Sequence, residues 1–365
     1  MPDRNSAAHR AMAAAVARMP DPVSYQETAL LETDLVAAFG TCRAVAVSSG
    51  TAAITTALAA CGIGEGHEVL LPAVTVVMTV AAVAACGARP VFVDSAADGR
   101  GMDLNDLAAK TGPATRAVVA VHLAGRTDGI HDLAAYTRAT GLRLIEDACQ
   151  AQGTTSGGRQ AGTIGDMGCF SLKDGKLLAC GEGGYLLTDN TDLAARAAAY
   201  RTHWQSDAPD APAGTHLGVN FRLAEPLAAL ARHHLTRFPE ALAQRREQAA
   251  ALHRAVDGTP GLEPITAAAG EEPNGYAALW RLTLPDPRAF AARLAQAGVP
   301  NSTGTHRLTA AHLHPACSRF ASGDLPHARV TVDALLAVPF TEHDTDEAIH
   351  RRALTIRREA VRWTR

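Results

Sequence analysis

Short apolar runs separated by helical patterns, between about residues 40 and 200, limit the fold of this chain more than any other feature. The runs indicate buried strands at residues 69–71, 91–93, 117–121, 142–145, 169–172 and 185–187. Helical spacing of apolar residues occurs between several of them, at residues 52–60, 77–85, 104–110 and 130–140. Continuous apolar strands that alternate with helices are typical of βαβ units. The sequence therefore predicts an α/β fold with a mostly parallel sheet flanked by helices.

A different pattern follows from about residue 220. One long helical region is predicted over residues 223–256, and the Gly-Thr-Pro-Gly stretch that follows ends it. Beyond it we expect strands at 280–284 and 334–338, helices at 286–297 and 344–361, and a loop at 269–275. We predict an N-terminal arm over residues 1–24, a large α/β domain over 25–240, and a linking helix with a smaller α+β domain over 241–365.

Charge and cysteine usage exclude several classes of protein. Lys and Arg total 34 against 37 Asp and Glu, with no block of like charge, so a nucleic-acid partner is not expected. No apolar run reaches the roughly 18 residues that span a membrane, and the N-terminus lacks the apolar stretch of a secretory signal. The seven cysteines are scattered without a Cys-x-x-Cys pair, which indicates a reduced, cytoplasmic protein.

A lysine in a glycine-rich turn is the first candidate for chemistry. A predicted strand passes through Ser171, Lys176 follows, and Gly-Glu-Gly-Gly occupies residues 181–184. A lysine in such a turn can form a Schiff base with an aldehyde when its amine is desolvated or lies near another cation. The alternative is an ordinary solvated lysine. Lys173, three residues earlier, weakens the signal, because the same argument applies to it.

An acidic pair ends the strand predicted at residues 142–145. Glu146 and Asp147 follow it directly, and ligands of open α/β sheets bind at the carboxyl ends of strands. A carboxylate at this place can keep a pyridine nitrogen protonated. The alternative for Asp147 is the capping of a following helix.

Ser49, Gly50 and Thr51 open the helix predicted from residue 52. Free backbone N–H groups and the helix dipole make such a terminus an anion site, and the alternative is plain capping by Ser or Thr. A phosphate cradle, a strand-end carboxylate and a turn lysine are together the groups that pyridoxal 5'-phosphate (PLP) requires. We therefore expect PLP as the cofactor.

The chain resembles the DegT/DnrJ/EryC1/StrS family of PLP-dependent sugar aminotransferases, which have the fold-type-I architecture of aspartate aminotransferase. The resemblance covers residues 25–240 in family order and is looser beyond them. It rests on eight stretches, at residues 49–53, 71–75, 90–94, 121–123, 145–151, 165–171, 181–184 and 218–222.

The resemblance implies a role for each matching residue. Lys176 resembles the lysine that carries the cofactor and acts as the base, and Asp147 resembles the carboxylate that faces the pyridine nitrogen. Gln150 is similar to the partner of the ring hydroxyl. The implied phosphate ligands are Gly50, Thr51, Ser171 and, from the neighbouring subunit, Asn220. The resemblance thereby implies a homodimer with shared active sites.

The implied reaction is transamination of a keto-sugar or keto-cyclitol, with L-glutamate or L-glutamine as the amino donor, in secondary-metabolite or antibiotic biosynthesis. An alternative inside the family is a PLP-dependent sugar dehydratase, whose members carry His at the position of Lys176. A second alternative is a non-catalytic protein of the same fold that acts as a regulator. The presence of Lys176, Asp147 and Gln150 together favours the aminotransferase.

Two residues depart from the family pattern. Val76 occupies the position where most members stack an aromatic ring on the cofactor, so an aromatic attraction worth about 0.5–1.5 kcal/mol is absent. Lys173 stands where the family usually has His, Gln or Asn, and we expect it either to act on Lys176 as a second cation or to point into solvent.

His312, His314 and Cys317 lack a matching second pair of ligands, so no metal is expected.

Overall fold

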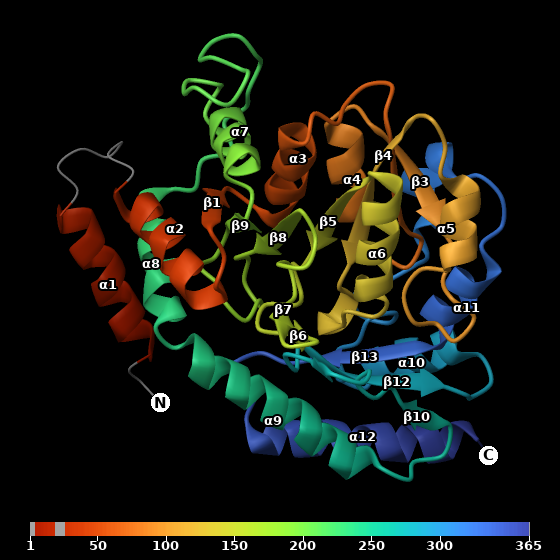
Figure 1. Ribbon diagram of the computed structural model, residues 1–365. Helices are drawn as coiled ribbons and strands as arrows, with labels where there is room; N and C mark the ends of the chain where they lie inside the picture. Colours follow the sequence, from red (N-terminus) through yellow and green to blue (C-terminus); the bar gives the residue numbers. More distant parts are fainter. Residues whose placement is uncertain (1–3, 19–25, 365) are drawn as a thin grey trace.

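The computed structural model describes residues 4–18 and 26–364. A seven-stranded sheet, in the order β1-β9-β8-β5-β4-β2-β3, forms its centre (Figure 1). The strands are β1 (Arg43–Val47), β2 (Glu68–Pro72), β3 (Arg89–Val93), β4 (Thr115–Val121), β5 (Arg143–Asp147), β8 (Met167–Ser171) and β9 (Gly184–Thr188). Pairing is parallel from β3 through β8, whereas β9 runs antiparallel to both β8 and β1. This confirms the predicted α/β fold and its mostly parallel sheet.

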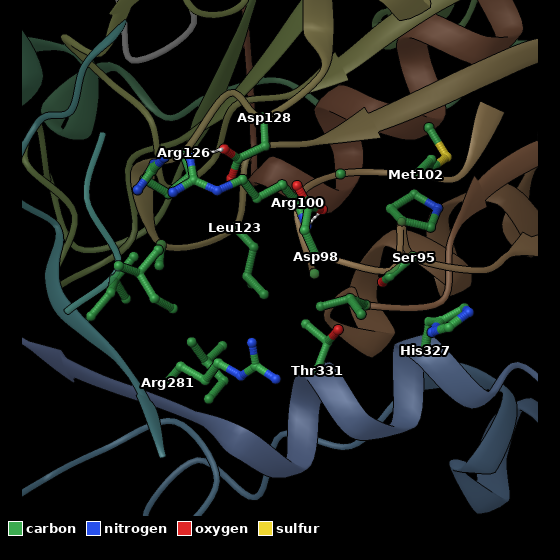
Figure 2. A pocket seen from close by; sticks show the side chains of 18 of the residues that line it. Ser95, Asp98, Arg100, Met102, Leu123, Arg126, Asp128, Arg281, His327 and Thr331 are labelled. Carbon is green, nitrogen blue, oxygen red and sulfur yellow. Dashed lines mark hydrogen bonds and ion pairs between the residues drawn. The ribbon is translucent and has the colours of Figure 1, made fainter. Parts of the chain in front are cut away.

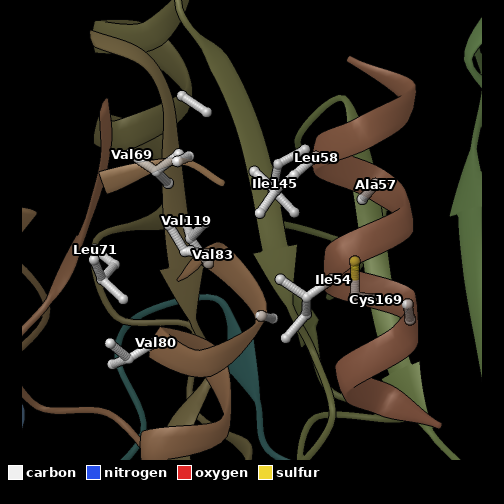
Figure 3. Close-up of a cluster of buried hydrophobic side chains, with 14 of the residues drawn as sticks. Ile54, Ala57, Leu58, Val69, Leu71, Val80, Val83, Val119, Ile145 and Cys169 are labelled. Atoms are coloured by element: carbon white, nitrogen blue, oxygen red, sulfur yellow. The ribbon is translucent and has the colours of Figure 1, made fainter. Parts of the chain in front are cut away.

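Helices cover both faces of this sheet because successive strand residues point to opposite sides. Ile145 packs into the core beneath α3 (Gly50–Ala60), α4 (Val77–Ala85) and α7 (Thr191–Arg201), as Figure 3 shows for α3. Its neighbour Leu144 packs into the core beneath α5 (Leu104–Lys110) and α6 (Ile130–Thr140). The four helices predicted between strands are all present. The strand β1 was missed, and it lies at the sheet edge.

The predicted single helix over residues 223–256 is wrong. The structure has two helices there, α8 (Glu225–Leu235) and α9 (Phe238–Val256). Pro239 lies in the first turn of α9, where its missing N–H costs nothing. Inside a continuous helix the same proline would clash with the carbonyl of residue 235, so the chain starts a new helix instead.

A second, three-stranded antiparallel sheet lies in the C-terminal third, with the order β10-β12-β13. Its core contains Trp280, Phe290 and Ile356. The elements here are β10 (Leu262–Pro264), β12 (Ala277–Leu282), α10 (Pro287–Gln296), the 3₁₀ helices η2 (Ala311–Leu313) and η3 (Pro315–Phe320), α11 (Pro326–Ala334), β13 (Leu335–Pro339) and α12 (Asp346–Trp363). The strands and helices predicted in this part are confirmed to within a few residues. The domain boundary at residue 240 stays a prediction.

The loop predicted at 269–275 contains a short strand, β11 (Glu271–Glu272). It pairs with β6 (Thr155–Ser156), which pairs in turn with β7 (Arg159–Gln160). Glu271 stabilises this connection, because its carboxylate accepts a hydrogen bond from the Thr127 N–H at 2.6 Å and pairs with Arg126 at 2.7 Å. The segment before β12 is thus attached to the loop region that follows β4.

The N-terminal part contains two helices, α1 (Arg4–Arg18) and α2 (Gln26–Phe39). Both pack beside α8 (Figure 1). The predicted arm is therefore helical over residues 4–18, and its residues 1–3 and 19–24 lie outside the described part. Among the helices described, none is both long and apolar enough to cross a membrane.

Candidate active site

Asp147 is the last residue of β5 and lies almost fully buried at the carboxyl edge of the sheet. Its Oδ2 accepts a hydrogen bond from the Thr79 hydroxyl at 2.6 Å, and its Oδ1 accepts one from the Cys149 N–H at 3.2 Å. β5 is followed by turns and by the strand β6, so no helix begins at Asp147. The capping alternative for Asp147 is therefore wrong, and the carboxylate is held in place by two donors.

Glu146, the other member of the acidic pair, points to the opposite face of the sheet. It is fully buried and accepts hydrogen bonds from His122 Nε2 at 2.7 Å and from the Ile164 and Gly165 N–H groups at 2.6 Å each. Burial raises the pKa of Glu146, but these hydrogen bonds outweigh it and hold the pKa below its usual value. Glu146 is thus a structural carboxylate that fixes the loop before β8.

The first turn of α3 is in direct contact with the ends of β5 and β8. A Cβ built on Gly50 would lie 2.8 Å from Cys149 Sγ and 2.9 Å from Ser171 Cβ, so no larger side chain fits without movement. Ser49 is the N-cap, and its Oγ accepts a hydrogen bond from the Ala52 N–H at 3.0 Å. Among the described residues, the N–H groups of Gly50 and Thr51 have no protein acceptor. They remain available to an anion, as a phosphate cradle requires.

Lys176 lies in the turn between β8 and β9 that the glycines shape. Gly175, Gly181 and Gly183 have φ values of +84°, +95° and +147°, a region of backbone conformation that side chains disfavour. The Lys176 N–H donates to the Lys173 carbonyl at 3.1 Å, while the Lys173 side chain is exposed. The exposure of Lys173 agrees with the expectation that its side chain points into solvent.

Cys149 lies where the predicted site residues meet. Burial raises the pKa of its thiol well above the usual value, the nearby Asp147 carboxylate raises it further, and the Lys176 ammonium opposes the rise. Asp147 and Lys176 thus both act electrostatically on a sulfur that also touches the Gly50 turn. Direct contacts thus join the Gly50 turn, Cys149, Ser171 and Asp147, whereas Lys176 is related to them through the effect of its ammonium on the pKa of the Cys149 thiol.

The structure places the three other predicted residues as follows. Gln150 accepts a hydrogen bond at its Oε1 from the Ala124 N–H, at 2.7 Å, in the 3₁₀ helix η1 (Leu123–Gly125). Val76 is half-buried at the N-cap position of α4. Asn220 is exposed, with its backbone paired to Thr202. The roles of these residues toward a cofactor stay predictions.

Sequence reasoning missed two residues at the site. Thr79 is the one polar residue in the apolar helix 77–85, and a buried hydroxyl in such a helix needs a partner. Tyr276, just before β12, has its ring centroid 5.3 Å from Lys176 Nζ. No local sequence signal points to Tyr276, because its contact spans about a hundred residues of the chain.

His312, His314 and Cys317 do not assemble a ligand set. His312 is buried with both ring nitrogens unpartnered, and burial lowers its pKa. His314 Nδ1 instead accepts a hydrogen bond from the Ala316 N–H at 3.2 Å. Within residues 4–18 and 26–364, no group of three His, Cys, Asp or Glu is placed to hold a metal ion.

A cavity of about 350 Å³ lies between the carboxyl ends of β2 and β4 and the C-terminal sheet (Figure 2). Leu123, Arg126, Arg281 and Thr331 are among the residues that line it. Lys176 and the other members of the cluster around Cys149 do not line it. Val74, two residues before Val76, is one of its lining residues. This cavity is therefore distinct from the predicted cofactor site.

Comparison with known proteins identifies the family. The family model described as the DegT/DnrJ/EryC1/StrS aminotransferase family matches residues 5–356. The chain belongs to this family. It is 35% identical over 288 residues to L-glutamine:2-deoxy-scyllo-inosose aminotransferase of Streptoalloteichus tenebrarius, a match that covers 76% of this chain and 65% of that protein.

Other members of the family are similar over different shares of their length. GDP-perosamine synthase of Caulobacter vibrioides is 36% identical over 207 residues, 56% of this chain and 55% of that protein. The matches to these two relatives thus span less than two thirds of each relative. The crystal structure of S. venezuelae DesV in complex with a ketimine intermediate has a TM-score of 0.87 at 29% identity, covering 98% of this chain and 95% of that one.

The hydrogen bond from Thr79 to Asp147 generates a stability prediction. Thr79→Val keeps the volume but removes one of the two donors to the buried Asp147 carboxylate, and a hydrogen bond to a charged group contributes about 1.5–3 kcal/mol. We expect the free energy of unfolding, measured by urea denaturation of the cofactor-free protein, to fall by about that amount. Thr79→Ser keeps the hydroxyl and serves as the control. Equal stability of the Val variant and the wild type would contradict the assignment.

Proposed function

We propose that this chain is a PLP-dependent aminotransferase that moves an amino group from an amino acid to a keto-sugar or keto-cyclitol. The observation that carries the proposal is the close approach of the Gly50 turn to Cys149 and Ser171, next to the buried Asp147 carboxylate that accepts from the Cys149 N–H. These residues come from three segments of the chain, and the turn that follows Ser171 carries Lys176. An amine, a carboxylate and a helix N-terminus at one place are the groups that this cofactor needs.

The residues present fit the cofactor. The unpartnered N–H groups of Gly50 and Thr51 and the Ser171 hydroxyl would hold its phosphate, and Gly50 leaves the room that this approach requires. Asp147 would hold the pyridine nitrogen and Gln150 the ring hydroxyl. When bound, PLP supplies an electron sink that makes the α-proton of an amino acid removable.

Each protein group then has one task. Asp147, held by Thr79 and the Cys149 N–H, keeps a proton on the pyridine nitrogen. Lys176 Nζ accepts the proton from the α-carbon of the amino donor. Donor and acceptor use the same site in turn, so the same amine serves both half-reactions in opposite directions.

The lysine decides between the alternatives inside the family. A dehydratase of the resembling type carries His at this position, whereas this chain has Lys176. A regulator without catalysis would have no need for a buried strand-end carboxylate held by two donors. The burial and the hydrogen bonds of Asp147 therefore favour the aminotransferase.

The relatives narrow the substrate class. The relative with the longer alignment is an L-glutamine:2-deoxy-scyllo-inosose aminotransferase, which supports a keto-cyclitol or keto-sugar acceptor with L-glutamine or L-glutamate as donor. GDP-perosamine synthase, a second relative, supports the nucleotide-sugar form of the acceptor. We place the reaction in secondary-metabolite or antibiotic biosynthesis. We place the protein in the cytoplasm, which agrees with its seven free cysteines.

We propose a homodimer in which Asn220 reaches the phosphate in the partner's site. The segment that follows α7 projects from the body of the chain (Figure 1) and carries Leu217, which is 95% exposed. Met78, in the first turn of α4 next to Thr79, is 53% exposed. In the proposed dimer, these two apolar side chains would be buried against the second copy.

The base assignment is tested by Lys176→Ala. General acid–base catalysis contributes about 10²- to 10⁴-fold, so we expect a loss of at least about 100-fold in the rate at which L-glutamine or L-glutamate bleaches the near-visible absorbance of the bound cofactor. Lys173→Ala, which removes an exposed lysine three residues earlier, is the matched control and should keep the rate. Turnover by the Lys176 variant, or equal losses in both, would overturn the assignment.

The missing ring at Val76 generates a prediction about cofactor affinity. Val76→Phe restores an aromatic face worth about 0.5–1.5 kcal/mol, so the dissociation constant of PLP should fall by roughly 2- to 10-fold. The measurement is an absorbance titration of cofactor-free protein. An unchanged constant would refute the idea that Val76 weakens the site.

The shared site is tested by mixing two inactive variants. Asn220→Asp places a negative charge at a phosphate ligand, and Lys176→Ala removes the base. If Asn220 acts across the interface, one site in each mixed dimer is intact, so subunit exchange should restore about a quarter of the wild-type activity. Recovery of no activity, although mixed dimers form, would show that Asn220 acts within its own subunit.

A further inference from the structure

The three residues before β12, Asn274 to Tyr276, reach from the C-terminal third to the candidate active site. Asn274 is 2% exposed, and its Nδ2 donates hydrogen bonds to the carbonyls of Gln150 and Gln152, both at 2.9 Å. Its N–H donates to the Thr154 hydroxyl at 3.1 Å. The segment is thereby attached to the loop that begins at Asp147.

The position of Tyr276 is fixed by the backbone on both sides. Gly275 has a φ of +73°, and a Cβ on it would lie 2.4 Å from the Arg245 carbonyl, so the segment is pressed against α9 at a place where only glycine fits. The Tyr276 N–H donates to Asn274 Oδ1 at 2.9 Å, and its carbonyl accepts from the Phe340 N–H at 3.3 Å. The backbone from which the Tyr276 ring projects is therefore fixed.

The ring of Tyr276 lies close to the amine of Lys176. The distance from Lys176 Nζ to the ring centroid is 5.3 Å, within the roughly 6 Å at which an ammonium is attracted to an aromatic face. The turn that carries the lysine is attached to the same support, because the buried Arg245 guanidinium donates to the Gly175 carbonyl at 3.4 Å. The segment that carries Tyr276 and the turn that carries Lys176 thus both contact Arg245 of α9.

We propose that Tyr276 is a positioning residue whose ring holds the Lys176 ammonium after the amine has taken the α-proton. In that step the C–H bond of the donor breaks, its electron pair stays with the carbon, and the proton forms a new N–H bond at Nζ. An aromatic face attracts the ammonium and not the neutral amine, so the ring acts once the proton has moved. The proposal rests on the base role of Lys176 proposed above.

The experiment compares Tyr276→Leu, which removes the ring, with Tyr276→Phe, which keeps it. For Tyr276→Leu we expect kcat with L-glutamine or L-glutamate to fall about tenfold, within the range of a desolvated cation–ring contact, while KM for the donor changes little. The Phe variant should recover most of that loss. Tyr136→Leu is the control, because Tyr136 lies on α6 with its hydroxyl near that of Thr111, 2.7 Å away, and kcat should not change.

Two further measurements separate positioning from folding. The dissociation constant of PLP, from titration of the cofactor-free protein, and the unfolding midpoint of that protein should stay near the wild-type values in Tyr276→Leu. Equal kcat in the Leu variant and the wild type, equal losses in Leu and Phe, or a loss that follows weaker PLP binding would each overturn the proposal. If Lys176→Ala keeps the wild-type rate, the base assignment itself fails. If Lys176→Ala loses activity but Tyr276→Leu keeps the wild-type kcat, the base assignment stands and only the role of Tyr276 fails.

Discussion

A hydrogen atom in place of a side chain at Gly50 allows the first turn of α3 to lie against Cys149 and Ser171. The anion-binding end of the candidate site depends on this approach, since a Cβ there would lie under 3 Å from both residues. The contact joins the N-terminus of one helix to the carboxyl ends of β5 and β8. It places two free N–H groups beside a carboxylate that belongs to another part of the chain.

The C-terminal third completes the site from the other side. Asn274 binds the backbone around Gln150, Arg245 binds the carbonyl before Lys176, and Tyr276 places its ring near the amine. Glu271 and Arg126 form a buried pair that holds the same segment near the loop after β4. The smaller sheet therefore takes part in shaping the site, although its own core is separate from the cores around the large sheet.

Periodicity in the sequence predicts much of this fold. The helices at 77–85, 104–110 and 130–140 were predicted at their observed bounds, because each shows a helical pattern between apolar strands. The break before Pro239 was missed because a proline in the first turn of a helix leaves the apolar pattern continuous. Lys176 and Asp147 stand out beside glycines and at a strand end. Thr79 and Tyr276 owe their contacts to tertiary packing across 68 and 100 residues. The lone hydroxyl in an apolar helix indicates that Thr79 has a partner without identifying it, and no local pattern points to Tyr276.

The central claim is that Lys176 is the lysine at which PLP attaches. The direct measurement is reduction of the PLP-loaded protein with borohydride, followed by proteolysis and peptide mass spectrometry. The account predicts a phosphopyridoxyl group on the peptide that contains Lys176, located on that residue by fragmentation. Attachment at Lys173 or at any other lysine of the chain would contradict it.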